Sequence, residues 1–336
     1  MRLRGIGTFL LAATASGSAL GGEPKVGERV DRRGDEIVIC GQLFHTTTPV
    51  KLWTDPGGYD AYRTERRFAP IDQSSFEKSK TDDLDTPNRF GMRKVKLSPG
   101  QVEQVRGGGW DLPLLREKVD QFVIHFDARG TSRGCFEVLH DRRGLSVQFM
   151  LDLDGTIYQT LDLKEGAWHA TKANGRSIGI EIANIGTFKD RNERLPARWY
   201  APDADGKIRI TPPDPNLLPA RAPGAGPLRP IRDQPVAGTI QGQELSQYDL
   251  TPQQYESLIK LTATLCKTFP RIRCDYPRDA QGRLIPHKLA DDVYDRYSGI
   301  LGHYHVQQNK VDPGPAFQWD RVIDGARKLI ADSNGP

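Results

Sequence analysis

Beyond its first twenty residues, the sequence has no apolar run of the ~18 residues that a membrane-spanning helix needs. It also has little excess charge, since 47 Lys and Arg oppose 43 Asp and Glu, and its basic residues form no long run. This balance predicts no nucleic-acid partner. The 24 prolines and 34 glycines stay below the roughly one quarter of a chain that indicates disorder. Without internal repeats or low-complexity tracts, the chain is expected to be folded, with long loops.

The first 22 residues have the pattern of a secretory signal peptide. Arg2 and Arg4 give a basic start, an apolar stretch follows around residues 8–13, and small residues stand at 16–19. This order is typical of signal peptides. No cysteine follows directly, so we expect no lipoprotein anchor. The pattern predicts an exported protein that is periplasmic or extracellular.

Export would expose the four cysteines to oxidising conditions. Cys266 and Cys274 stand close together in the sequence, so a bridge between them is possible there. Cys40 and Cys135 could form a second bridge. Four cysteines allow three pairings, and the sequence alone does not choose among them.

Two regions differ from the rest in composition. Residues 23–116 mix short apolar runs with turn formers, and within them Glu36–Ile39 predicts a strand. We interpret this region as an extension that packs on the core. Residues 187–248 are rich in proline, glycine and charge, which excludes helix interiors at the proline clusters. We interpret them as a long surface insertion.

Short apolar or alternating runs predict strands at four places: residues 122–126, 145–153, 156–160 and 177–182. The pair Asp154 and Gly155 predicts a hairpin turn between the second and third. In the last run the isoleucines share one face, and Gly179 and Glu181 share the other. Thr251 and Pro252 predict a helix start, and a final helix is expected from about Pro315. Strand pairs followed by helices predict a mixed α/β (α+β) fold.

Seven histidines are present, and their surroundings distinguish them. His125 lies inside an apolar run, where an ionisable ring needs a partner; alone, it could be a hydrogen-bonded core residue. His303 follows Gly302, and Asp312 stands nine residues later. Histidine and aspartate both bind zinc, and three protein ligands leave one position open for catalysis. The helical His-Glu-x-x-His motif is absent, so spacing alone does not establish a zinc site.

Four segments in the same order resemble the N-acetylmuramoyl-L-alanine amidase family, which also contains the peptidoglycan recognition proteins. The segments are residues 123–125, 145–159, 167–181 and 302–317. The resemblance covers about 117–332, interrupted by the insertion. It implies a zinc amidase domain with a central mixed β-sheet flanked by helices.

The resemblance also implies roles for five residues. His125, His303 and Asp312 match the zinc ligands, Glu181 matches the acid–base glutamate, and Lys310 matches a lysine two residues before the last ligand. The implied reaction is hydrolysis of the amide between N-acetylmuramic acid and L-alanine of peptidoglycan or muropeptides. Water activated by Zn²⁺ would be the nucleophile.

Substrate contacts are predicted for four residues: Trp168, His169, Asn174 and Arg142. Two of them have an alternative: His169 could support its loop, and Arg142 could be solvated rather than paired with a stem-peptide carboxylate. His305 is a second candidate for the ligand place of His303, which we favour because Gly302 precedes it.

Two other functions remain open at this point. A binding protein could recognise muropeptides without cutting them, although the presence of all three ligands, Glu181 and Lys310 favours an enzyme. A zinc hydrolase could also act on a different amide, for example in a competitor's cell wall.

Overall fold

The computed structural model describes residues 26–27, 30–63, 90–189, 194–219 and 224–333. Residues 34–336 form one compact unit. The predicted signal peptide, residues 1–22, lies outside the described residues.

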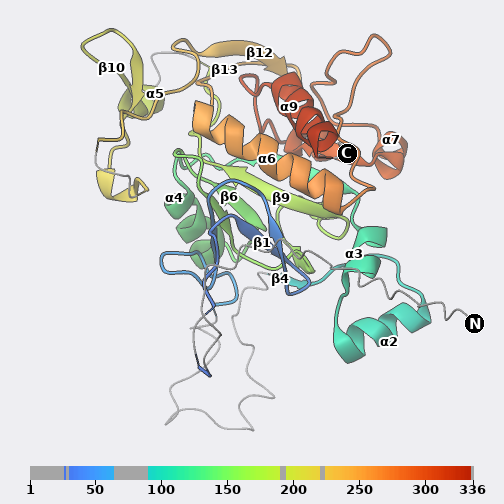
Figure 1. Ribbon diagram of the computed structural model, residues 1–336. Helices are drawn as coiled ribbons and strands as arrows, with labels where there is room; N and C mark the ends of the chain where they lie inside the picture. The colour runs from blue at the N-terminus through green and yellow to red at the C-terminus, as the bar shows by residue number, and fades with distance from the viewer. Residues whose placement is uncertain (1–25, 28–29, 64–89, 190–193, 220–223, 334–336) are drawn as a thin grey trace, which may run out of the picture. The chain divides into compact units, whose positions relative to one another are not determined.

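A six-stranded mixed sheet with the strand order β14-β5-β9-β6-β7-β3 forms the centre of the fold (Figure 1). Its strands are β3 (Val50–Leu52), β5 (Gln121–Phe126), β6 (Phe149–Leu151), β7 (Ile157–Gln159), β9 (Ser177–Ile182) and β14 (Gly299–Gly302). Neighbouring strands are parallel except for the β6–β7 hairpin. The central mixed sheet predicted from the sequence is therefore confirmed.

The α-helices of the described residues are α2 (Pro99–Gly108), α3 (Leu112–Lys118), α4 (Ser132–Phe136), α5 (Arg194–Trp199), α6 (Pro252–Thr268), α7 (Asp291–Arg296), α8 (His303–Val306) and α9 (Trp319–Asp332). Of these, α4, α6 and α8 contact strands of the central sheet directly. Figure 1 shows α6 and α9 side by side, and the two helices are in direct contact. The predicted start of α6 is confirmed, because Thr251 caps it in a capping box with Gln254.

Strand alternation divides the sheet into two faces. Ile178, Ile180 and Ile182 of β9 belong to the large core cluster that includes the inner residues of α6 and α9. Met150 of β6 points to the opposite side, where it packs in a separate cluster with Phe136 of α4. The residues of β5 and β9 on this second side include His125 and Glu181, so α6 and α9 cover the face away from them.

Two predicted boundaries differ from the structure. The expected strand 145–153 shortens to β6, because the Gln148 side chain accepts the Gly179 N–H at 2.8 Å in place of a backbone ladder bond. The last helix begins at Trp319 and not near Pro315. Ala316 donates its N–H to the side chain of Gln247, and this contact keeps the chain extended before the helix.

The remaining strands form two-stranded sheets. They are β1 (Glu36–Ile39) with β2 (Gln42–His45), β4 (Phe90–Met92) with β8 (Glu165–Ala167), β10 (Tyr200–Pro202) with β11 (Ile208–Ile210), and β12 (Val236–Ile240) with β13 (Gln243–Gln247). Residues 23–116 thus contribute β3 to the central sheet, and residues 187–248 contain two hairpins.

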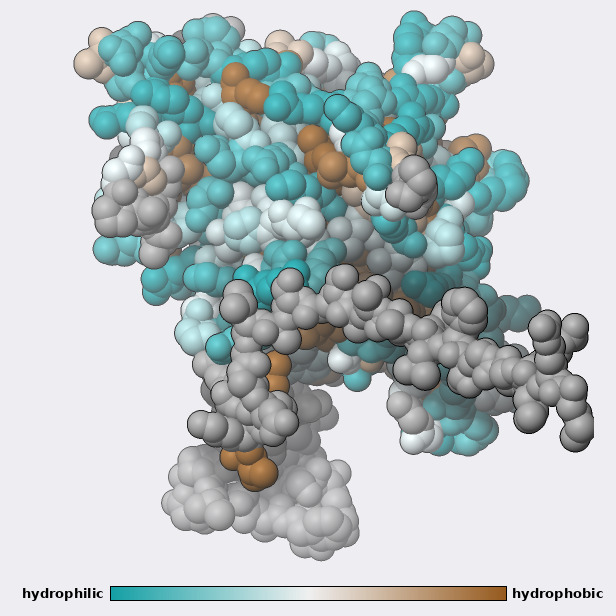
Figure 2. Space-filling view, in the orientation of Figure 1, coloured by the Kyte–Doolittle hydropathy of each residue, from teal (hydrophilic) through white to brown (hydrophobic). Residues whose placement is uncertain are grey.

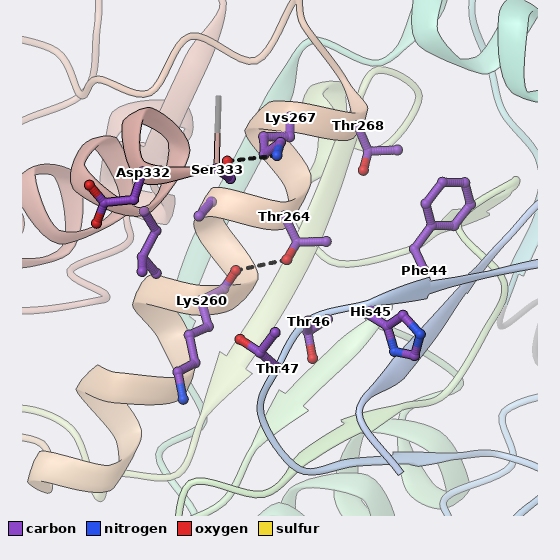
Figure 3. A pocket seen from close by; sticks show the side chains of 12 residues that line it. Phe44, His45, Thr46, Thr47, Lys260, Thr264, Lys267, Thr268, Asp332 and Ser333 are labelled. Carbon is purple, nitrogen blue, oxygen red and sulfur yellow. Dashed lines mark hydrogen bonds between the residues drawn. The ribbon is translucent and has the colours of Figure 1, made fainter. Parts of the chain in front are cut away.

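The face seen in Figure 2 is largely hydrophilic, with hydrophobic atoms in small separate spots. No helix among the described residues is long and apolar enough to cross a membrane. A hollow of about 520 Å³ lies between β2, α6 and the end of α9. Figure 3 shows Lys267 bonded to Ser333 within it. None of the predicted site residues lines this hollow.

The cysteines are thiols in this structure. Cys266 of α6 and Cys274 are in contact, because their side chains share a hydrogen bond that raises the pKa of Cys266 and lowers that of Cys274. Cys135 is buried beside the second face of the sheet, whereas Cys40 packs against the large core cluster. The arrangement suits the first of the two expected bridges.

Asp152, buried at the end of β6, gives a pH-dependent prediction. Burial raises its pKa to about 7, above the ~3.9 of an unfolded chain. The stabilising protonated form is therefore fully present below pH ~3.9 and is lost as the pH rises through 7. Asp152→Asn should raise the free energy of unfolding by about 2–4 kcal/mol at pH 8 and leave it nearly unchanged at pH 4. Urea unfolding at both pH values measures this, and an equal effect at both would contradict it.

Candidate active site

The register of two central strands places a histidine beside a glutamate. In the parallel pair β5–β9, His125 lies directly opposite Glu181. Because side chains alternate along a strand, both point to the face that α6 and α9 leave uncovered. Two residues that are 56 positions apart in the sequence are therefore neighbours in the fold.

Two further groups reach this pair from the segment that follows β14. His303 begins α8 directly after that strand, and Asp312 follows in the next loop. The Nδ1 atoms of His125 and His303 are 2.9 Å apart, and Asp312 Oδ2 lies 2.9 Å from each. All three side chains are buried. This His-His-Asp group could bind a metal ion, since each residue offers one ligand atom toward a common point.

The far ring nitrogens of both histidines also have partners. His125 Nε2 lies 3.0 Å from His169 Nδ1, and His169 Nε2 lies 3.2 Å from Ser177 Oγ. His303 Nε2 lies 2.6 Å from Gln307 Oε1. Such partners fix the ring orientation of metal-ligating histidines. The ring of His169 rests on Gly179, where a Cβ would lie 2.6 Å from it.

Protonation in this cluster also suits metal binding. Burial and the neighbouring His303 lower the pKa of His125 to about 4. Burial opposes ionisation of Asp312, but the two imidazoles hold the pKa of its carboxyl well below the usual range. A neutral imidazole at His125 and an ionised carboxylate at Asp312 are forms that bind metals.

His305, the alternative to His303, has both ring nitrogens engaged elsewhere. Its Nδ1 accepts the Gly302 N–H at 2.9 Å, and its Nε2 lies 2.8 Å from the Ile285 carbonyl oxygen. The ring is fully buried among these partners. Both ring nitrogens of His305 therefore bond to backbone groups, and His303 is the histidine of the His-His-Asp group.

The cluster opens into a cavity of about 350 Å³. The charged or polar side chains that line it are His125, Asp127, Arg129, Arg143, Trp168, His169, Glu181, His303, Lys310 and Asp312. Burial, Asp312 and Asp127 raise the pKa of Glu181 well above its usual value. Its buried Oε2 has no hydrogen-bond partner among the described residues. A polar atom in this state is available to a bound water or substrate.

Of the four residues predicted to contact substrate, two line the cavity and two do not. Trp168 and His169 line the cavity. Asn174 instead accepts the backbone N–H groups of His169 and Ala170, at 3.1 and 2.7 Å, and so shapes their loop. Arg142 is exposed and does not line the cavity, whereas its neighbour Arg143 does.

Sequence reasoning missed Asp127 and Arg129. They follow β5 directly, and Asp127 Oδ1 accepts the Arg129 and Gly130 N–H groups at 2.9 and 2.8 Å. Their position just after a buried strand could have identified them, because ligands bind at the carboxyl ends of such strands.

A buried His-His-Asp group lies at one end of a mixed sheet, beside a glutamate with one carboxylate oxygen that no described residue bonds. This arrangement defines a candidate metal-dependent hydrolase. A profile of the N-acetylmuramoyl-L-alanine amidase family matches residues 115–315. The chain therefore belongs to this family, as its resemblance predicted, and with it to the amide-cleaving enzymes. No curated protein sequence matches the chain.

Solved structures of similar proteins also include amidases. One is the amidase AmiD from E. coli in complex with anhydro-N-acetylmuramic acid-L-Ala-D-gamma-Glu-L-Lys, with 18% identity and a TM-score of 0.34; the match covers 62% of this chain and 57% of that one. A selenomethionine AmpD derivative has 16% identity and a TM-score of 0.29, over 62% and 86%. The endolysin LysCS from Clostridium intestinale has 18% identity and a TM-score of 0.32, over 64% and 86%.

Proposed function

We propose that this protein hydrolyses the amide bond between N-acetylmuramic acid and L-alanine in peptidoglycan or muropeptides, with Zn²⁺ as cofactor. The observation that carries the proposal is the convergence of His125, His303 and Asp312 on one point beside Glu181. Family membership supports the choice of amide.

The three ligand residues fit zinc in kind and number. Two imidazole nitrogens and one carboxylate oxygen leave a fourth position open, as catalytic zinc sites do. Zinc bound there would act as a Lewis acid and lower the pKa of a water molecule to ~7. The partners of His125 and His303 on their outer nitrogens would keep both rings turned inward.

Glu181 is proposed as the general base and then the general acid. Burial and the neighbouring carboxylates raise the pKa of this carboxyl, which makes its ionised form a stronger base than an exposed glutamate. The carboxylate would take the proton of the attacking water and pass it to the nitrogen of the departing L-alanine. Lys310 lines the same cavity and would stabilise the negative charge that develops on the carbonyl oxygen.

Trp168 and His169 are proposed to border the substrate, because both line the cavity. The predicted leader at residues 1–22 remains a proposal, and with it export to the periplasm or the cell exterior. The division of the chain into an extension over 23–116 and an amidase domain over 117–332 is likewise a proposal. An exported amidase would meet polymeric peptidoglycan directly.

The test is release of stem peptides from purified sacculi by the zinc-supplied protein. We expect new L-alanine amino termini, detected by amino-group labelling and mass spectrometry, and intact glycan strands. Sacculi that are bound but not cut would favour the recognition-protein alternative. Sacculi that are neither bound nor cut, with soluble muropeptides also unchanged, would refute the proposal.

A further inference from the structure

Gln247, at the end of β13, is buried against the loop that carries Asp312. Its exposed fraction is 1%. Its Nε2 donates to the Pro313 carbonyl at 3.0 Å, and its Oε1 accepts the Ala316 N–H at 3.0 Å. One side chain from the β12–β13 hairpin therefore binds the backbone on both sides of Gly314.

Gly314 shows how closely the loop fits this side chain. It adopts a φ of +86°, and a Cβ there would lie 2.2 Å from Gln247 Oε1. Gly238 of β12 makes a similar approach, since a Cβ there would lie 2.9 Å from Pro315 Cβ. The loop after Asp312 is thus pressed against both strands of the hairpin.

A second glutamine, at the hairpin turn, binds the segment that carries His303. Gln241 Nε2 donates to the carbonyls of Tyr304 and Gln307, at 2.9 and 3.0 Å. Its Oε1 accepts the Lys288 N–H at 3.1 Å. The side chain of the same Gln307 contacts His303 Nε2. The hairpin therefore holds the backbone next to both ligands that come from the end of the chain.

The contacts of Gln247 continue to the strands that carry the other two site residues. Its Nε2 lies 3.3 Å from Asn184 Oδ1, and Asn184 follows Glu181 just beyond β9. The Asn184 N–H in turn donates to Asp127 Oδ1 at 3.1 Å, and Asp127 follows His125 just beyond β5. All three side chains are buried. Buried hydrogen bonds of this kind favour one arrangement of the segments that they join.

We propose that the β12–β13 hairpin is a clamp that sets the position of His303 and Asp312 relative to His125 and Glu181, with Gln247 and Gln241 as its positioning residues. This inference rests on the proposed function, because it takes the His-His-Asp group as the metal site. The proposal assigns a positioning role to the C-terminal end of the 187–248 insertion. The hairpin contributes no ligand and no residue of the cavity lining; it acts through the backbone of the ligand loop.

The test compares Gln247→Leu with Gln159→Leu in the full chain. Gln159 is also buried, and it bonds the backbone of Val38 and Leu161 with three hydrogen bonds of 2.7–2.8 Å, away from the cavity. Zn²⁺ affinity is measured by competition with a chromophoric chelator, and ligand geometry by the absorption spectrum of the Co²⁺-loaded protein. The unfolding temperature of the metal-free protein reports the loss of stability.

We expect Gln247→Leu to bind Zn²⁺ about 10- to 100-fold more weakly, the range found when partners of metal ligands are removed. Its Co²⁺ bands should shift. Gln159→Leu should lower the unfolding temperature but leave the affinity and the spectrum unchanged. Gln241→Asn, which tolerates the φ of +54° there but has a shorter side chain, should weaken binding in the same direction. This variant also serves as the test if Gln247→Leu does not fold.

The clamp is refuted if Gln247→Leu and Gln241→Asn bind both metals as the wild type does. It is also refuted if Gln159→Leu loses as much affinity as they do, because the effect is then general destabilisation. A wild type that binds Zn²⁺ but cuts neither peptidoglycan nor soluble muropeptides would overturn the proposed function and leave the clamp intact. A wild type that binds no Zn²⁺ would overturn both.

Discussion

His303→Ala should abolish stem-peptide release and lower bound zinc to a small fraction of one ion per chain. The two remaining ligand residues, His125 and Asp312, cannot complete a three-residue site. Loss of the ion removes electrophile and activated water together. Deleting a single oxyanion donor lowers a rate by up to ~10³-fold. The rate of stem-peptide release should fall by more than this. Metal analysis by mass spectrometry and an end-point assay on sacculi measure both effects.

The matched control is His305→Ala, two residues further along α8. This histidine is buried and bonds the Gly302 N–H and the Ile285 carbonyl. Its loss should lower the free energy of unfolding by about 1–3 kcal/mol while the chain keeps one zinc ion. The reverse result, in which His303→Ala keeps zinc and His305→Ala loses it, would assign the ligand role to His305.

Glu181→Gln should leave zinc in place and lower kcat by about 10²- to 10⁴-fold, the usual contribution of a general acid–base group. The amide is nearly isosteric but cannot take the proton of water. KM should change little, because the loss concerns proton transfer and not ground-state binding. Steady-state kinetics on a soluble muropeptide, with zinc content measured in parallel, separates these effects.

Glu165→Gln provides the comparison for that prediction. Glu165 of β8 is another half-buried glutamate whose pKa is raised by burial, but its carboxylate bonds Tyr62 outside the cavity. It should keep nearly full kcat. If Glu181→Gln retains more than a tenth of the wild-type kcat, Glu181 is not the acid–base group. If Glu165→Gln falls equally, the effect is one of folding.

Local pattern was sufficient to predict the strands that carry the site. The apolar run around His125 and the alternation of Ser177–Ile182 predict buried strands, and β5 and β9 confirm them. The alternation also separated Glu181 from the isoleucines. It could not show that His125 lies opposite Glu181, because register between strands far apart in sequence depends on the whole sheet.

Other features depend on contacts that no local pattern contains. Arg142 and Arg143 are adjacent in sequence, and only the path of the chain decides which one lines the cavity. Asn174 is a polar loop residue of unremarkable pattern, and its bonds to the backbone at 169 and 170 emerge only in the fold. Gln247 lies in a segment whose proline and glycine content predicted a surface loop. Its burial results from packing against Gly314, 67 residues later.

The strand order means that the His-His-Asp group combines residues from two distant parts of the sequence. β14, the final strand of the sheet, pairs with β5, and His303 lies 178 residues after its partner His125. A polypeptide that stops before residue 299 would contain the glutamate and a single ligand, however much of the sheet it formed. The proposed hydrolysis therefore requires the chain at least as far as Asp312, and a truncation before residue 299 should give an inactive protein.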